Sequence, residues 1–420
     1  MTDSHIEARR NLAASAENVS GADTSHAFPV ASERKHVPVL DGLRGVAILL
    51  VLFKHFFISG DPTGFINVAY FKARAGGWAG VDLFFVLSGF LITGILVDAK
   101  SSPHYFRNFY ARRFLRIFPI YFAFLFFLYT LLPAIRPYTS PEYRSAVENQ
   151  WWFWAYLTNV YIALKGTWTV AIGAEQYWTL AVEEQFYIVW PLLVFLTPRR
   201  HLQTVCVAII VMAFGLRLYC VLTNANPITA SILTPMRMDS LALGAILAVA
   251  ARDPGQNARV VGWSLPAAVV SGVLLCGVFA YDGRINPYDP LMQTAGFTLL
   301  ALFFGSVLVA AQAGRLGALI GGMLTGRFLR LMGKYSYGIY IYHEFVLDTI
   351  VQPYVRATSR LHLPWLASQF GYFAVCFAIS VTVAALSWRW FESPILSLKR
   401  YFQMPDEREA GPRTPASATT

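Results

Sequence analysis

Charged residues are scarce in this chain of 420 residues, at 14% of the total, against about 25% in an ordinary soluble domain. Hydrophobic residues make up 56%. Once the apolar runs are set aside, no long polar segment is left that could form a second, water-soluble domain. A deficit of charge spread over most of the chain excludes an ordinary soluble protein and indicates that lipid is the solvent.

Cysteine is also rare, and its spacing excludes the common metal sites. All four cysteines lie inside apolar runs, and no two of them have metal-ligand spacing: Cys206, Cys220, Cys276 and Cys376. We therefore expect small, buried hydrophobic side chains at these positions and no bound metal.

The sequence also lacks the marks of a signal peptide, of a nucleic-acid-binding domain and of a pump. Residues 1–36 are polar, without an apolar core followed by a small-residue cleavage site, so we expect a disordered cytoplasmic tail there and another over residues 397–420. The net charge of +10 does not form a basic patch on a soluble fold, which argues against nucleic acid as a partner. There is no nucleotide-binding loop and no internal repeat.

What the chain does contain is a series of apolar segments, each near the length of about 20 residues that crosses a membrane. Ten segments qualify: Gly42–Gly60, Gly80–Val97, Phe114–Leu132, Thr179–Leu196, Gln203–Leu222, Met238–Ala251, Val261–Tyr281, Thr294–Ala313, Ser336–Gln352 and Gln369–Trp390. The sixth is short enough to be a broken or tilted helix. The aromatic segment Trp151–Leu164 suits an interfacial or re-entrant piece better than a full span.

The predicted fold class is therefore all-α, a polytopic membrane bundle of about ten transmembrane helices in one domain over residues 37–396. Lysine and arginine set its orientation. If the N-terminus is cytoplasmic, the tails and cytoplasmic loops hold 20 basic residues and the opposite loops hold 9. We therefore expect both termini in the cytoplasm.

Arg44 and His55 lie eleven residues apart in the first predicted span. At about 100° per residue they return to within about 20° of one helical face, with His55 about 16 Å from Arg44 and near the middle of the membrane. His343, in the ninth span, is predicted at a similar depth. An imidazole reached by water could act as a base near neutral pH. The alternative is an arginine that snorkels to headgroups and a histidine satisfied in the core.

Arg112, Arg113 and Arg116 gather at the cytoplasmic edge of the third predicted span. Arg113 and Arg116 are three residues apart and share a helical face. Because arginine binds phosphate oxygens bidentately and stays charged when partly buried, the pattern predicts a phosphate cradle. Ordinary positive-inside anchoring is the alternative.

Acidic residues also occur within the apolar segments, at an insertion cost of roughly 2.5–3.5 kcal/mol each. Asp82 stands in the first turn of the second span, and Asp239 begins the sixth. Glu183 and Glu184 are adjacent in the fourth span, and at least one of them should face a cavity or a cation. Stabilisation by a helix dipole is the structural alternative for Asp82 and for the glutamate pair.

The mid-span pair Ser88 and Gly89 favours a close helix-packing contact over a nucleophile. It belongs to the run GVDLFFVLSGFLI at Gly80–Ile92, and other motifs follow along the chain: RFLR, WTLAVEEQFY, RMDSLALG, SYGIYIYH and WRWFESP.

In this order, the motifs resemble those of the acyltransferase-3 family of integral-membrane acyltransferases, over roughly residues 39–394. The family's Arg-x10-His arrangement is present as Arg44 and His55, and its arginine motif as Arg113 and Arg116. WTLAVEEQFY departs from the family pattern, which has serines at the positions of Thr179 and Ala181. That departure argues against a serine nucleophile there.

The resemblance implies a membrane O-acyltransferase in the bacterial inner (plasma) membrane. It would transfer an acetyl or other short acyl group from acyl-CoA, with acetyl-CoA as the expected donor, to a hydroxyl of a cell-surface or secreted glycan. Membrane lipid and a carbohydrate acceptor are the other expected partners. The alternatives are a small glycosylated acceptor such as a macrolide, a transporter or flippase for a lipid-linked oligosaccharide, and a structural scaffold. The oligomeric state is left open.

The resemblance also suggests roles for the charged residues. His55 would be the general base, Arg44 would orient the donor or stabilise oxyanion charge, and Glu183 would orient an imidazole or bind the sugar on the outer side. Arg113 and Arg116 would hold the CoA phosphates. Four further residues would contact the acceptor: Asp82, Glu184, Asp239 and His343. Direct transfer and a covalent acyl-enzyme both stay possible at this point.

Overall fold

The computed structural model describes residues 37–60, 62–135, 141–171, 173–283 and 285–402. Helices are the regular structure of this part of the chain, and eight helical segments in it are long and apolar enough to cross a membrane. The chain is a multi-pass, all-α membrane protein. The expected tails lie outside the described residues at 1–36 and 403–420, whereas Leu398–Tyr401 form a 3₁₀ turn.

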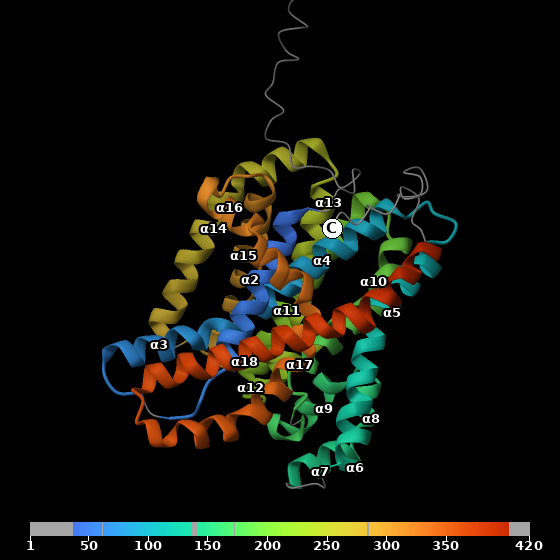
Figure 1. Cartoon of the computed structure of the whole chain (residues 1–420). Helices are drawn as coiled ribbons and strands as arrows, with labels where there is room; N and C mark the ends of the chain where they lie inside the picture. Colours follow the sequence, from blue (N-terminus) through green and yellow to red (C-terminus); the bar gives the residue numbers. More distant parts are fainter. Residues whose placement is uncertain (1–36, 61, 136–140, 172, 284, 403–420) are drawn as a thin grey trace, which may run out of the picture.

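The first half of the bundle starts with α2, which passes through its middle in Figure 1. Its helices are α2 (Pro38–His55), α3 (Phe65–Ala75), α4 (Gly80–Asp98), α5 (Tyr105–Phe126), α6 (Leu132–Ile135), α7 (Pro141–Glu148), α8 (Trp151–Trp154), α9 (Thr158–Lys165) and α10 (Tyr177–Leu196).

The second half contributes α14 at one edge of the view in Figure 1, with α5 of the first half at the opposite edge. Its helices are α11 (Arg199–Leu222), α12 (Pro227–Ile232), α13 (Thr234–Ala250), α14 (Pro254–Asp282), α15 (Phe297–Gln312), α16 (Gly317–Thr325), α17 (Arg327–Thr358), α18 (Trp365–Ser387) and α19 (Ser393–Ser397).

Each of the ten predicted spans lies largely within a helix, but α2 and α17 fall outside the eight apolar ones. The reason is their polarity: α2 alone carries Asp41, Arg44 and Lys54 within 18 residues. Such charge in a membrane helix is expensive and points to a polar interior rather than to lipid. The two helices least suited to lipid are therefore the two that carry His55 and His343.

Two helix boundaries differ from the sequence prediction in ways that matter for the site. α2 begins at Val37–Pro38, where proline suits the first helical turn, and leaves the helix at Phe56 (φ −75°, ψ 82°). His55 is therefore the last residue of α2, and its predicted depth near the middle of the membrane stays a prediction. α5 begins at Tyr105 instead of Phe114, so the arginines lie inside this helix rather than at its start.

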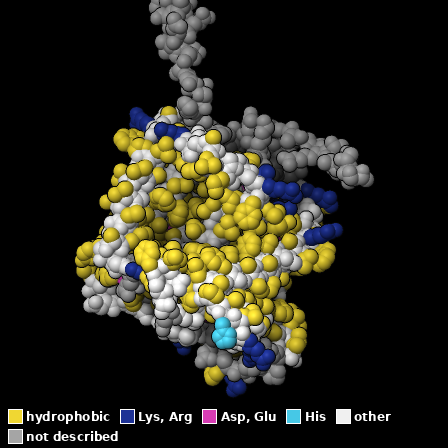
Figure 2. Space-filling model, turned by 60° about the vertical axis from the view of Figure 1, so that its left-hand side comes forward, with side chains coloured by type: hydrophobic (Ala, Val, Ile, Leu, Met, Phe, Trp, Pro, Cys, Tyr) yellow, Lys and Arg dark blue, Asp and Glu magenta, His cyan; other side chains and the backbone are white. Residues whose placement is uncertain are grey.

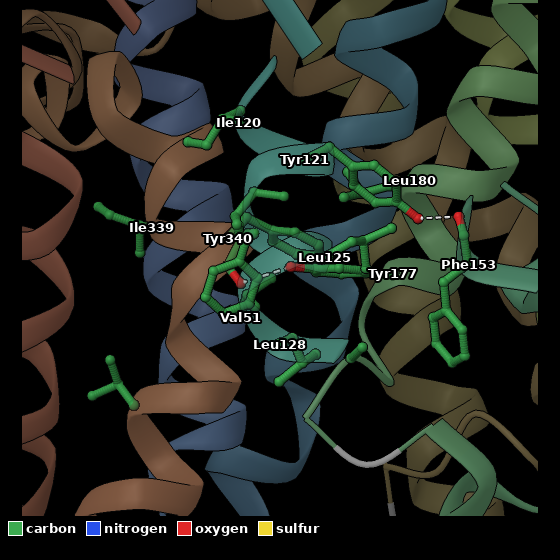
Figure 3. Close-up of a cluster of buried hydrophobic side chains, with 14 of the residues drawn as sticks. Val51, Ile120, Tyr121, Leu125, Leu128, Phe153, Tyr177, Leu180, Ile339 and Tyr340 are labelled. Carbon is green, nitrogen blue, oxygen red and sulfur yellow. Dashed lines mark hydrogen bonds between the residues drawn. The ribbon is translucent and has the colours of Figure 1, made fainter. Parts of the chain in front are cut away.

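One of the two irregular segments follows the prediction. Residues 151–164 form the short helices α8 and α9 instead of one span, and Phe153 of α8 is buried in the core, where its carbonyl accepts a hydrogen bond from Tyr121 of α5 (2.8 Å; Figure 3). The helix is interrupted at Leu233, between α12 and α13, just before the sixth predicted span, which lies largely within α13.

Two helix crossings bring backbone against backbone. In α4 and α13, a Cβ at Gly89 would overlap the carbonyl oxygen of Leu241, and one at Gly244 would overlap that of Val86. In α2 and α17, a Cβ at Gly333 would overlap the carbonyl oxygen of Asp41. Small residues allow this approach where lipid supplies no hydrophobic driving force between helices. The interpretation of Gly89 as a packing residue is confirmed.

The outer surface is largely apolar, as a protein in lipid requires. Figure 2 shows hydrophobic side chains over the middle of one face, with Lys and Arg gathered at its upper right and along its lower edge. Exposed leucine, valine and phenylalanine side chains on α10, α11 and α14 make up much of this surface.

Gly89→Ala should destabilise the protein by roughly 1–3 kcal/mol because the added methyl group forces α4 and α13 apart. Gly215→Ala is the matched control, since Gly215 is exposed on α11 with open space around it. There the change should be neutral or stabilising by about 0.5–1 kcal/mol. Thermal unfolding in detergent, followed by size-exclusion chromatography, measures both. Equal melting temperatures for the two variants would contradict the packing argument.

Candidate active site

Two cavities lie towards opposite ends of α2. The smaller, of about 180 Å³, is called here the arginine cavity, and the larger, of about 710 Å³, the histidine cavity, because its wall contains His55. Three arginines line the smaller one: Arg44, Arg113 and Arg116. Val81 and Tyr340 line both cavities and so stand between them. Figure 3 shows Tyr340 directed from α17 into the core, near Val51 of α2.

The arginine cavity has a strongly cationic mouth. A further hollow of about 130 Å³ is lined by the same three arginines together with Arg112 and Lys399. Arg44 also pairs with Asp41 at 3.1 Å, one turn earlier on α2. The prediction that Arg113 and Arg116 share a face is confirmed, and Arg44 of another helix joins them. Five cationic groups around one narrow opening form a surface suited to an anion.

Glu183 belongs to the arginine cavity as well. Its Oε1 accepts a hydrogen bond from Ser88 at 2.7 Å, and Tyr187 donates to its Oε2 at 3.3 Å and to Ser88 at 3.1 Å. The described wall of this cavity contains no histidine. Glu183 therefore does not orient an imidazole in this structure, whereas the alternative that it binds the sugar on the outer side stays a prediction. Glu184 lines the same cavity, so both neighbouring carboxyls reach it.

At the other end of α2, the structure brings the two predicted imidazoles together. The Nδ1 of His55 lies 3.1 Å from the Nε2 of His343, and the Nδ1 of His343 lies 2.8 Å from the carbonyl oxygen of Tyr340. His343 is fully buried, whereas His55 also lines the histidine cavity.

This geometry assigns the tautomers when both rings are neutral. A carbonyl oxygen only accepts, so the Nδ1 of His343 carries the proton and its Nε2 is an acceptor. The Nδ1 of His55 then donates to that nitrogen, which leaves the Nε2 of His55 with a free lone pair. A base that is held in one tautomer by its other ring nitrogen is suited to remove a proton.

One carboxyl group lies beside the free nitrogen of His55, and two others line the same cavity. Glu344 Oε1 lies 3.6 Å from His55 Nε2, close enough to stabilise an imidazolium. Glu175 and Asp348 line the same cavity. Burial raises the pKa of the Glu175 carboxyl, which lies in the loop before α10 and shares a hydrogen bond with Glu344. The sequence prediction placed Glu344 beside His343 in the ninth span but assigned a role to none of these three acids, although Glu344 and Asp348 are four residues apart on one helical face, a signal it could have used.

One group of donor atoms could also hold a metal ion. The ligand atoms of His55, His343 and Glu344 all lie within 4.8 Å of one another. The two imidazole rings, however, already hydrogen-bond to each other. A metal ion there would replace that bond, so the arrangement fits a proton-transfer site more directly than a metal centre.

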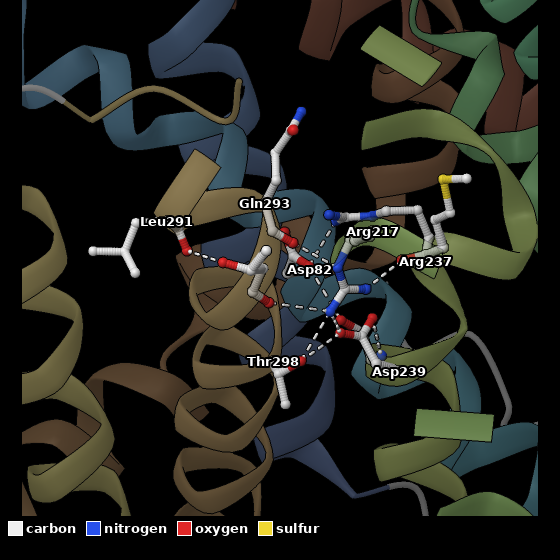
Figure 4. Close-up of polar contacts among 10 residues, drawn as sticks. Asp82, Arg217, Arg237, Asp239, Leu291, Gln293 and Thr298 are labelled. Atoms are coloured by element: carbon white, nitrogen blue, oxygen red, sulfur yellow. Dashed lines mark hydrogen bonds and ion pairs between the residues drawn. The ribbon is translucent and has the colours of Figure 1, made fainter. Parts of the chain in front are cut away.

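Asp82 and Asp239 are not where an acceptor could touch them. Both are fully buried, and Asp82 pairs with Arg237 and Asp239 with Arg217, each at 2.7 Å (Figure 4). Neither aspartate lines a cavity described above, so their predicted contact with substrate is wrong. A buried carboxylate needs a partner cation, and here α13 supplies one of the two arginines.

Comparison with known proteins gives one family. Residues 37–388 match the family described as "Acyltransferase domain". The chain is 27% identical to the peptidoglycan O-acetyltransferase OatA of Listeria monocytogenes, over 86% of this chain and 56% of the relative. It is also 27% identical to the putative peptidoglycan O-acetyltransferase YrhL of Bacillus subtilis, over 86% and 55% of the two chains.

A third relative is the O-acetyltransferase OatA of Staphylococcus aureus, 24% identical over 90% of this chain and 61% of that protein. The chain thus spans between 55% and 61% of the length of these relatives. No solved structure matches it. With 352 of its residues matched to the family and the predicted motifs in place, the chain belongs to the acyltransferase-3 family of membrane acyltransferases.

Proposed function

We propose that this protein transfers an acetyl or other short acyl group from acyl-CoA to a hydroxyl group of a cell-wall or other surface glycan, at the bacterial plasma membrane. The family and the names of the relatives support the reaction class and a carbohydrate acceptor. The observation that carries the proposal is the pair of cavities that meet at Tyr340, one lined by arginines and the other containing His55.

In this proposal the arginine cavity receives the donor from the cytoplasm. Arg113 and Arg116, with Arg44, bind the phosphates of coenzyme A at the mouth. The cavity behind them, at about 180 Å³, is narrow and suits an extended thioester arm better than a nucleotide. Its remaining wall is largely aliphatic and aromatic, and Glu183 fixes part of it through Ser88 and Tyr187.

The histidine cavity receives the acceptor. His55 Nε2 takes the proton of the acceptor hydroxyl as its oxygen attacks the thioester carbonyl carbon. The C–S bond then breaks, and the proton on His55 goes to the leaving thiolate, which departs as the CoA thiol. Glu344 stabilises the imidazolium that forms between these steps. A direct transfer of this kind needs one base and no nucleophilic side chain.

Purified protein in detergent tests the proposal when it is supplied with acetyl-CoA and a soluble glycan acceptor. We expect release of CoA thiol, together with a mass increase of the glycan by one acetyl group. A flippase for lipid-linked oligosaccharides would do neither. Absence of both products from folded protein, with several acyl donors tried, would overturn the proposal.

His55→Ala should abolish transfer, with a loss of about 10²–10⁴-fold in kcat, because the general base is gone. The protein should still fold, since His55 ends its helix and the backbone contacts that pack α2 against α17 lie at its other end. His201→Ala is the control, as His201 is exposed and lies on no described cavity. Transfer at the rate of the unchanged protein by a well-folded His55→Ala variant would rule out this base.

His343→Ala should lower kcat by about 10- to 100-fold while leaving the KM for donor and acceptor nearly unchanged, because His343 only positions the base. His343→Gln should recover part of the rate, since its Oε1 can accept the same hydrogen bond from His55. Steady-state kinetics in both substrates separates these effects. A large change in either KM with kcat retained would assign His343 to substrate binding instead.

Arg113→Ala and Arg116→Ala should each raise the KM for acetyl-CoA at least about tenfold, since each removes a charge-assisted hydrogen bond to phosphate. The KM for the glycan should change little. Arg107→Ala is the matched control, an exposed arginine on the same helix that lines no described cavity. Full activity of the Arg→Lys variants at both positions, or an effect on acceptor kinetics alone, would contradict the phosphate cradle.

A further inference from the structure

A third hollow opens on the lipid-facing side of the bundle. It lies between α5, α10 and Phe402, with a volume of about 370 Å³, and is called here the lateral groove (α5 and α10 are labelled in Figure 1). Its lining includes Tyr110, Phe114 and Ile188, which are 37%, 52% and 61% exposed. Leu192, one turn after Ile188 on α10, is also an exposed hydrophobic residue, so the groove continues into a surface suited to lipid.

Three side chains stand between this groove and the arginine cavity. Arg113, Glu184 and Tyr187 line both, and the Arg113 guanidinium lies 5.8 Å from the centroid of the Tyr187 ring. Charged groups are costly next to hydrocarbon unless a partner or water reaches them. Whatever fills the lateral groove therefore covers the lipid-facing side of the arginine cavity.

One end of the lateral groove is cationic. Phe402 lines the groove, its carbonyl accepts a hydrogen bond from Arg112 Nη1 at 3.3 Å, and its N–H donates to the carbonyl of Lys399 at 3.0 Å. Arg112 and Lys399 also line the hollow of about 130 Å³ described above, and the proposed binding of coenzyme A uses neither. Basic pockets between membrane helices bind anionic lipid headgroups, so the chemistry at this end suits such a group.

Along α5 the rest of the lateral groove is apolar. Phe114, Leu115 and Phe118 line it, and from Arg112 to Phe118 the helix rises about 9 Å. One leaflet contributes about 15 Å to the hydrocarbon core of a bilayer, so the groove runs beside more than half of the depth of an acyl chain. An apolar groove of this length that is cationic at one end complements an amphiphile with a negative headgroup.

We propose that the lateral groove binds an anionic phospholipid as a resident lipid. Its phosphate lies beside Phe402, between Arg112 and Lys399, and one acyl chain runs along Phe114 and Phe118. The bound lipid closes the lipid-facing side of the arginine cavity. A phospholipid without net charge fills the same groove with its chain but gains less from the two cations. This site does not depend on the reaction that the protein catalyses.

Native mass spectrometry of the purified protein tests the inference. The probes are phosphatidylglycerol and phosphatidylcholine with identical acyl chains, added to delipidated protein in detergent without acyl donor. We expect one phosphatidylglycerol to be retained at least about fivefold more often than phosphatidylcholine, because each Lys or Arg near the headgroup attracts an anionic lipid. Phosphatidylglycerol should also raise the melting temperature of the unchanged protein more than phosphatidylcholine does.

Ala111→Trp should abolish this retention, because Ala111 lines the lateral groove and an indole there occupies the place of the acyl chain. Ala208→Trp is the matched control, since Ala208 is exposed on α11 and lines none of the hollows described above. The control variant should retain phosphatidylglycerol as the unchanged protein does.

Lys399→Gln should lower the preference for phosphatidylglycerol by about threefold or more, since the substitution removes one of the two cations but leaves the groove open. Lys334→Gln is the control, because Lys334 is an exposed lysine of α17 that lines none of these hollows. Lys399 lies in the 3₁₀ turn Leu398–Tyr401, outside the long helices, so this pair tests the inference even if Ala111→Trp does not fold.

Equal retention of the two lipids by the unchanged protein would overturn the inference, as would a preference that survives in both Ala111→Trp and Lys399→Gln. Loss of the preference in both control variants as well would assign it to the lipid-facing surface and the net charge in general, and would contradict a site between α5 and α10.

Discussion

The contact between the backbones of α2 and α17 is the constraint on which the site depends. Gly333 of α17 lies against the carbonyl of Asp41, and Gly45 of α2 lies against that of Leu329. These approaches fix the relative depth of the two helices near one end. At the C-terminal end of α2, His55 then lies level with His343 in the middle of α17, with 3.1 Å between their ring nitrogens. A larger residue at either glycine would shift one ring along the other.

The buried ion pairs give a second fixed element beside the cavities. Arg217 is fully buried and bonds to Asp239, Thr298 and the carbonyls of Met236 and Gln293 (Figure 4). The Arg217–Asp239 pair is tolerated in the interior because nearly every polar atom of Arg217 has a hydrogen-bond partner. Arg237 is the exception, and it is the arginine that reaches the histidine cavity.

Sequence patterns predicted the helices well, because a run of about 20 apolar residues has the length of a membrane-spanning helix. They also predicted a similar depth for His55 and His343 and a shared helical face for Arg113 and Arg116. They failed for Glu183, Asp82 and Asp239, because a helical period gives a residue's face but not the helix that packs against it. Glu175 was missed for another reason: it lies in a loop, where no period applies.

Val81 and Tyr340 separate the two cavities, and this separation bears on the electrical insulation of the membrane. An enzyme fed from both sides risks opening a wetted path for protons and ions, each of which would cross at the expense of the membrane potential, about 2.3 kcal/mol per charge at 100 mV. Tyr340, which hydrogen-bonds Thr179 and the carbonyl of Gln176, and the aliphatic Val81 form a part of the wall that would oppose a continuous water column. A bound acyl-thioester arm that passes between Val81 and Tyr340 would fill the space between them and would itself block the passage of water and ions.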